Sequence, residues 1–117
     1  MIGKKKGNIY EFKLKRKIQH SGIEVVKIAG SGACYDDKGD LSTESFLIEC
    51  KHYNHATKSQ ISEWWKKIVV QSKLMEKIPV LAVKENYKPE WFQVKLQKLI
   101  VKMDYDNFIN YVKQIEG

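Results

Sequence analysis

Proline and cysteine are scarce in this sequence. Two prolines and seven glycines in 117 residues are too few for a linker or a low-complexity protein. The two cysteines, Cys34 and Cys50, form no CxxC pair and cannot complete a cysteine-based zinc site by themselves. We expect an intracellular protein, and therefore expect both thiols to be reduced rather than joined in a disulfide.

Long apolar runs are also missing. No window of about 18 apolar residues exists, which argues against a transmembrane helix and a membrane partner. The lysines of residues 1–7 are not followed by the apolar run of a signal peptide, so we expect no secretion. The expected location is the cytoplasm, or the host cytoplasm if the protein is viral.

Basic residues outnumber acidic ones. The formal charge is +7 and the pI is near 9.3, which favours a polyanionic partner, although the same charge also serves solubility. The basic residues gather in two segments, and clusters of this kind suit phosphate contacts. The first holds Lys4, Lys5, Lys6, Lys13, Lys15, Arg16 and Lys17, and the second holds Lys66, Lys67, Lys73 and Lys77.

The pattern of apolar residues predicts an α/β domain. Hydrophobic residues are 43% of the chain, enough for a core in a single domain over residues 1–117. Apolar spacing predicts helices over residues 7–20 and 58–76 and a last helix that Asp104 or Asp106 caps. The expected inward stripe of the second helix comprises Ile61, Trp64, Trp65, Ile68, Ser72 and Met75.

The strands are expected between these helices. Residues 23–29 and 46–53 have the β-branched and apolar composition of strands, and a short strand or turn begins at Asp40. Residues 80–84 form another strand, and residues 91–103 hold one or two more. The resulting α-β-β-β-α-β order, with strand and helix after it, predicts a mixed sheet flanked by helices.

Glu49 and Lys51 are the first candidates for chemistry. Alternate residues of a strand point to the same face, so both side chains share one face at the end of an apolar strand. A charge buried there is costly unless it is paired or binds a metal. An ion pair on a solvated sheet face is the alternative, and such pairs are common.

Asp40 lies nine residues before Glu49. If residues 40–44 turn and Phe46 returns antiparallel, Asp40 approaches Glu49. Two carboxylates at one point repel unless a divalent cation lies between them, and Mg²⁺ prefers such oxygen ligands. A nearby lysine can then serve the attacking water or stabilise the developing charge. Asp40 can also be a simple turn aspartate, and Asp36 or Asp37 can take the ligand role instead.

Glu11 is a further candidate carboxylate. It lies seven residues, or two helical turns, before Ile18, so it shares the inward face of the first helix. A carboxylate there requires a partner, or else it lies at the solvent boundary of the stripe.

These residues together resemble a known family. Residues 7–11 (GNIYE), residues 23–32 (IEVVKIAGSG), Asp40, residues 48–51 (IECK), Gln60 and residues 80–84 (VLAVK) resemble, in order and spacing, archaeal-type Holliday junction resolvases of the PD-(D/E)XK nuclease superfamily. The resemblance covers residues 5–95. It implies a restriction-endonuclease-like αβββαβ core over about residues 7–95, with a strand and helix extension over about residues 96–117.

The resemblance also implies an activity. The protein would be a homodimeric, Mg²⁺-dependent endodeoxyribonuclease that cuts four-way DNA junctions, and Mn²⁺ would substitute. Glu11, Asp40 and Glu49 would hold the metal, Lys51 would serve the water, and Gln60 would support the site. DNA contacts would come from Lys4, Lys5, Lys6, Lys13, Arg16, Ser31 and Lys58.

The sequence departs from that pattern in places. Gly39 replaces the motif's proline, the span from Asp40 to Glu49 is short for a resolvase, and no counterpart is evident after about Trp91. Another nicking, restriction-type or repair nuclease is therefore an alternative. So is a non-catalytic basic DNA-binding module in which Glu49 and Lys51 form a structural ion pair. His52 and His55 lack the further ligands that a zinc site needs.

Overall fold

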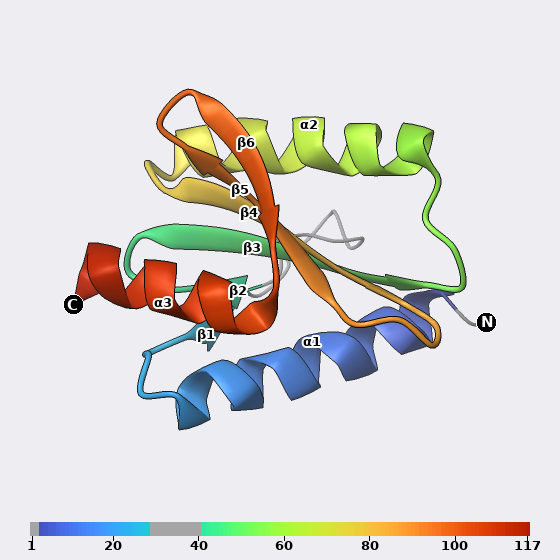
Figure 1. Cartoon of the computed structure of the whole chain (residues 1–117), viewed down its shortest axis with the longest axis horizontal. Coiled ribbons are helices and arrows are strands. Elements are labelled where there is room, and N and C mark those ends of the chain that lie inside the picture. Colours follow the sequence, from blue (N-terminus) through green and yellow to red (C-terminus); the bar gives the residue numbers. More distant parts are fainter. Residues whose placement is uncertain (1–2, 29–40) are drawn as a thin grey trace.

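A mixed sheet forms the centre of the molecule (Figure 1). The computed structural model describes residues 3–28 and 41–117, with side chains from Asn8 onward. In this part of the chain the sheet order is β1-β2-β3-β4-β5-β6. The strands are β1 (Val26–Lys27), β2 (Leu41–Ser42), β3 (Phe46–Tyr53), β4 (Ile78–Glu85), β5 (Trp91–Leu96) and β6 (Leu99–Met103).

Helices cover both faces of this sheet. Helix α2 (Lys58–Leu74) connects β3 to β4, which pair in parallel, while the other neighbouring strands are antiparallel. It lies on one face, and α1 (Gly3–His20) and α3 (Tyr105–Glu116) lie on the other (Figure 1). The predicted mixed sheet flanked by helices is confirmed.

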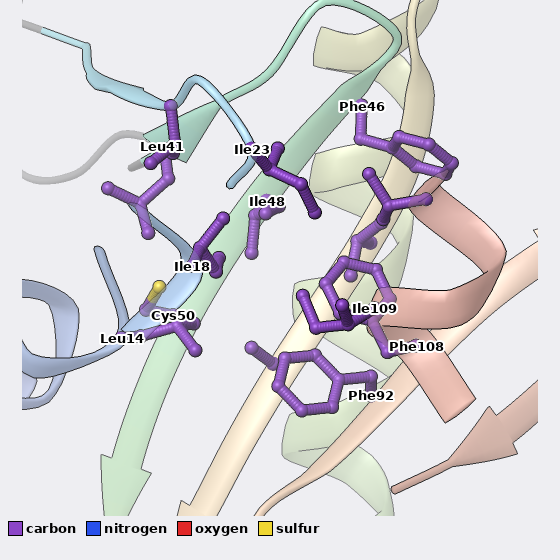
Figure 2. Close-up of a cluster of buried hydrophobic side chains, with 14 of the residues drawn as sticks. Leu14, Ile18, Ile23, Leu41, Phe46, Ile48, Cys50, Phe92, Phe108 and Ile109 are labelled. Carbon is purple, nitrogen blue, oxygen red and sulfur yellow. The ribbon is translucent and has the colours of Figure 1, made fainter. Parts of the chain in front are cut away.

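The main core lies between the sheet and the helices α1 and α3. Leu14 and Ile18 of α1 pack with Ile48 and Cys50 of β3, as Figure 2 shows, and all four are buried. Alternation along β3 therefore sends its even-numbered side chains toward α1 and its odd-numbered side chains toward α2. A smaller cluster under α2 contains Ala56, Trp64, Leu81 and Val83.

The expected strand over residues 23–29 is shorter in the structure. Ile23 and Val25 are buried as predicted, but the described ladder contains only Val26 and Lys27, which pair with Ser42 and Leu41. A strand needs a partner for its backbone groups, and β2 ends at Ser42, where the Thr43 N–H donates to the Phe46 carbonyl in the turn into β3, so the residues before Val26 have no partner in the ladder. The end of the predicted range, at Ala29, lies outside the described residues.

Helix α2 begins and ends through local interactions. Thr57 and Gln60 form a reciprocal capping box at its start: the Gln60 N–H donates to Thr57 Oγ1 at 3.1 Å, and the Thr57 N–H donates to Gln60 Oε1 at 3.0 Å. The predicted stripe is correct for Trp64, Ile68 and Ser72, which are buried. It is wrong for Met75, which is 43% exposed, because the helix ends at Leu74 and Met75 is its C-cap.

The C-terminal segment is part of the same sheet and core. β6 pairs with β5 along the outer edge of the sheet. Asp104 caps α3 by accepting a hydrogen bond from the Asn107 N–H at 2.9 Å, as one of the two predicted caps. Phe108 is fully buried and stacks on Phe92, with ring centroids 4.5 Å apart. Glu116 at the end of α3 accepts a hydrogen bond from the Ser45 N–H at 2.8 Å.

Candidate functional site

Glu49 and Lys51 lie side by side on the α2 face of β3. Glu49 is only 7% exposed, and Lys51 Nζ lies 3.3 Å from Glu49 Oε2. The side chain of Lys51 retains 24% exposure. The apolar half of β3 anchors the strand in the core, so its charged half reaches the edge of the buried region. A charged pair at this position meets solvent on one side and protein on the other.

Two aromatic rings complete the surroundings of Lys51. Its Nζ lies 5.4 Å from the centroid of the Trp64 ring, and Trp64 is 9% exposed on the inward face of α2. Tyr53 lies two residues beyond Lys51 on the same strand face, with its ring centroid 4.9 Å from that of Trp64. The lysine is therefore held between a carboxylate and an aromatic face.

Glu11 belongs to α1 and contacts β1. It is 8% exposed, and Lys27 Nζ lies 2.7 Å from its Oε1. The prediction of an inward carboxylate that requires a partner fits this contact. On the neighbouring position, the Tyr10 hydroxyl donates to Glu90 Oε1 at 2.8 Å, and burial raises the pKa of Tyr10 well above its usual value. That hydrogen bond ties α1 to the start of β5.

Several predicted site residues lie outside the described part of the chain. They are Ser31, Asp36, Asp37 and Asp40. The described register nevertheless pairs Leu41 with Ile48 in the antiparallel arrangement that the sequence analysis expected. Leu41 is the covalent neighbour of Asp40, and Ile48 is the neighbour of Glu49.

The predicted DNA-contacting residues lie on two helices. Lys13 and Arg16 are exposed on α1, and Lys58 is exposed at the start of α2. Lys4, Lys5 and Lys6 belong to α1, but their side chains are outside the described set. Gln60 has a structural role, since its side chain caps α2.

His52 and His55 make separate contacts. His52 Nε2 lies 2.9 Å from Asn86 Oδ1, and His55 Nδ1 lies 3.3 Å from Glu85 Oε2. Glu85 also accepts a hydrogen bond from the Ala56 N–H at 3.0 Å, and this bond lowers the pKa of Glu85. The two histidines therefore support the turns that follow β3 and β4.

The donor atoms of Glu49 are of a type that fits a hard divalent cation. Glu49 is a buried carboxylate with oxygen donors of the kind that Mg²⁺ prefers. Within residues 8–28 and 41–117, no group of three or more His, Cys, Asp or Glu side chains is placed to hold a metal ion.

Comparison with protein families identifies the family of the chain. Residues 3–116 match the family described as "Phage putative PDDEXK endonuclease". The chain belongs to this family. Glu49, Cys50 and Lys51 have the E-x-K spacing that the name of this family describes.

A solved structure supports the same fold. The chain is similar to Hjc from Archaeoglobus fulgidus, a Holliday junction resolvase from an archaeal hyperthermophile, with a TM-score of 0.51 and 12% identity. The similarity covers 95% of this chain and 100% of that one. It therefore includes residues after Trp91, for which the sequence showed no counterpart. No curated protein matches the chain.

Sequence reasoning missed two contacts at the candidate site. The ring of Trp64 over Lys51 was not foreseen, although Trp64 was placed on the inward stripe of α2. Lys27 was not named as the partner of Glu11. Neither pair has a sequence signal, because each joins residues 13 or more positions apart that meet only when a helix packs on the sheet.

None of the described helices has the length and hydrophobicity to cross a membrane.

Proposed function

We propose that this protein is a Mg²⁺-dependent endodeoxyribonuclease that hydrolyses phosphodiester bonds at a site centred on Glu49 and Lys51. The observation that carries the proposal is the buried Glu49 carboxylate 3.3 Å from the Lys51 ammonium, at the E-x-K position of a PDDEXK family member. Mn²⁺ is expected to substitute for Mg²⁺.

The metal ligands are proposed as Glu49, Asp40 and Glu11. Asp40 is supported by its bond to Leu41, which pairs with the residue next to Glu49. Glu11 is supported by its burial, and Lys27 would have to share or release it. When bound, the cation would polarise the phosphate and lower the pKa of a coordinated water.

The chain's own residues supply the remaining chemistry. Lys51 would orient the attacking water or stabilise the negative charge that develops on the phosphate. The same ammonium lies beside Glu49 before DNA binds, which keeps the buried carboxylate neutralised. Gln60 is proposed to support the site through the cap of α2, the helix that carries Trp64.

The DNA partner is proposed to be branched. The similarity to the structure of a Holliday junction resolvase supports a four-way junction as the substrate. We further propose a homodimer in which each subunit cuts one strand, as the resemblance of the sequence motifs to the resolvase family implies. Lys13, Arg16 and Lys58 are exposed and are proposed to contact phosphates with Lys4, Lys5, Lys6 and Ser31. Sedimentation of the protein alone and with one junction measures the stoichiometry.

The test is cleavage of a synthetic four-way junction beside linear duplex, flap and single-stranded DNA, in Mg²⁺ or in EDTA. Glu49→Gln and Lys51→Met should each lower the cleavage rate at least about a hundredfold, because each removes a group that acts in the transition state. DNA affinity should stay within a fewfold of the parent value. Glu44→Gln and Lys95→Met change exposed residues of the same types and should cut normally.

The outcomes separate the alternatives. Paired symmetric nicks on the junction alone support a resolvase, and metal-dependent cutting of the other DNAs moves the function to a broader endonuclease. Binding without cleavage under any metal condition would contradict the proposal and leave a DNA-binding module with a structural ion pair.

A further inference from the structure

Lys51 has two partners of different kinds. Its ammonium lies 3.3 Å from Glu49 Oε2 and 5.4 Å from the centroid of the Trp64 ring. The first contact joins residues of one strand, two positions apart. The second contact crosses from the sheet to α2. The ring of Trp64 therefore restricts the Lys51 side chain from a different element than the strand that carries it.

The Trp64 ring is itself held firmly. It is 9% exposed and packs with Leu81 and Val83 of β4, which are fully buried. The ring of Tyr53 lies 4.9 Å away at an angle of 48°. A ring fixed on several sides presents its face in one orientation, and an aromatic face attracts a cation within about 6 Å of its centroid.

The two partners of Lys51 respond differently to a bound metal. A divalent cation on Glu49 neutralises the carboxylate, and this weakens the attraction that holds the ammonium beside it. The ring face is unaffected, because it carries no titratable or metal-binding atom. The aromatic contact is thus the one that persists when the metal is bound.

We propose that Trp64 is a positioning residue that holds the Lys51 ammonium at the site when the Glu49 carboxylate binds the metal. This inference rests on the proposed nuclease function. If Trp64 has this role, then helix α2 helps to set the position of Lys51 through the face of the Trp64 ring.

The test compares substitutions that keep or remove the ring face. Trp64→Phe keeps an aromatic face, and Trp64→Leu keeps apolar volume without one. We expect Trp64→Leu to lower the single-turnover cleavage rate at saturating protein by about two- to thirtyfold, the factor that a cation–π contact of usual strength represents. DNA affinity should not change, and Trp64→Phe should restore most of the rate.

Trp91 provides a matched control. It packs against the same cluster, and Lys102 Nζ lies 4.3 Å from its ring centroid. Lys102 is exposed on β6 and belongs to no part of the proposed site. Trp91→Leu should therefore lower stability without the rate loss. Equal rate losses in Trp64→Leu and Trp91→Leu would assign the effect to packing and overturn the proposal.

A second readout does not depend on cleavage. Unfolding by urea in EDTA is measured for Trp64→Leu, Lys51→Met and the double variant. We expect the double variant to be less destabilised than the sum of the single variants, since the contact can be lost only once. The same cycle with Trp91→Leu and Lys51→Met should be additive. Additive effects of Trp64→Leu and Lys51→Met would show that the ring does not hold the lysine. If Trp64→Leu does not fold, Trp64→Met replaces it in both experiments.

Failure of the inference and failure of the nuclease function give different results. If Glu49→Gln and Lys51→Met cut like the parent protein, the nuclease site is wrong and the positioning role falls with it. If both abolish cleavage while Trp64→Leu cuts at the rate of Trp64→Phe, the site stands and only the positioning role is overturned.

Discussion

Glu85 joins the end of β4 to the segment before α2. Its carboxylate accepts a hydrogen bond from the Ala56 N–H and lies 3.3 Å from His55. The bond from Ala56 lowers the pKa of Glu85 below the usual value of a glutamate, with a further contribution from the charges of Lys88 and His55. The pKa of Glu85 is therefore lower in the folded state than in the unfolded state. The ionised side chain stabilises the fold fully above the unfolded-state pKa, and this stabilisation is lost as the pH falls through the folded-state pKa.

We predict that Glu85→Gln lowers the free energy of unfolding at pH 7. The difference in this free energy between the parent protein and the variant should shrink as the pH falls through 4.5 and below. Acid protonates the parent carboxylate and removes the stabilisation that the variant already lacks. Urea titrations from pH 3 to pH 7 measure the difference. Glu44→Gln, at an exposed glutamate, is the control, and a difference that stays constant down to pH 3 would contradict the prediction.

A reciprocal cap stabilises the start of α2, the helix that packs against the candidate site. Thr57 and Gln60 satisfy backbone N–H groups at this end of the helix, and these groups otherwise lack partners within a helix. The same helix carries Trp64 one turn further on. We therefore expect that loosening the cap disturbs the ring above Lys51.

We predict that Thr57→Ala lowers the free energy of unfolding by about 1 kcal/mol. Gln60→Ala should cost less, because the Thr57 hydroxyl still caps the helix. Thermal unfolding measures both changes, and Ser59→Ala at an exposed position is the control. The two cap variants should lower cleavage to a similar, small extent; a much larger loss in Gln60→Ala would mean that its amide acts on the site directly.

At the scale of the whole molecule, α3 closes the core that the sheet leaves open. Phe108 stacks on Phe92 and lies edge-on to Phe46, with ring centroids 4.5 Å and 6.1 Å apart. Glu116 then fixes the end of the helix to Ser45, in the turn between β2 and β3. The last residues of the chain thus cover the strand that carries Glu49 and Lys51.

We predict that Phe108→Ala lowers the free energy of unfolding by about 3–5 kcal/mol, the usual cost of a large cavity in a core. Ile115→Ala, at a residue that is 47% exposed, should change it by about 0.5 kcal/mol at most. Denaturation followed by circular dichroism measures both. A small effect of Phe108→Ala would mean that residues 96–117 are an accessory to a core that is stable without them.

Much of the architecture could be predicted from local pattern. β3 has the predicted bounds, and Asp104 caps α3, because alternation and capping are properties of neighbouring residues along one backbone. The expected strand over residues 23–29 begins only at Val26, since the start of a ladder depends on the partner strand. Met75 was wrongly placed inward, since periodicity alone does not reveal where a helix ends.

The sequence by itself determined that Glu49 and Lys51 share a strand face, because this follows from the repeat of a single element. For Glu11 it left two positions open, inward on the helix or at the solvent boundary of the stripe. Only the tertiary structure decided which residues meet them. Trp64 lies over Lys51 and Lys27 lies against Glu11 because α2 packs across β3 and β4 on one face and α1 packs on the other. The partner of a charged side chain is set by the packing of elements that are distant along the chain, and no local pattern records that packing.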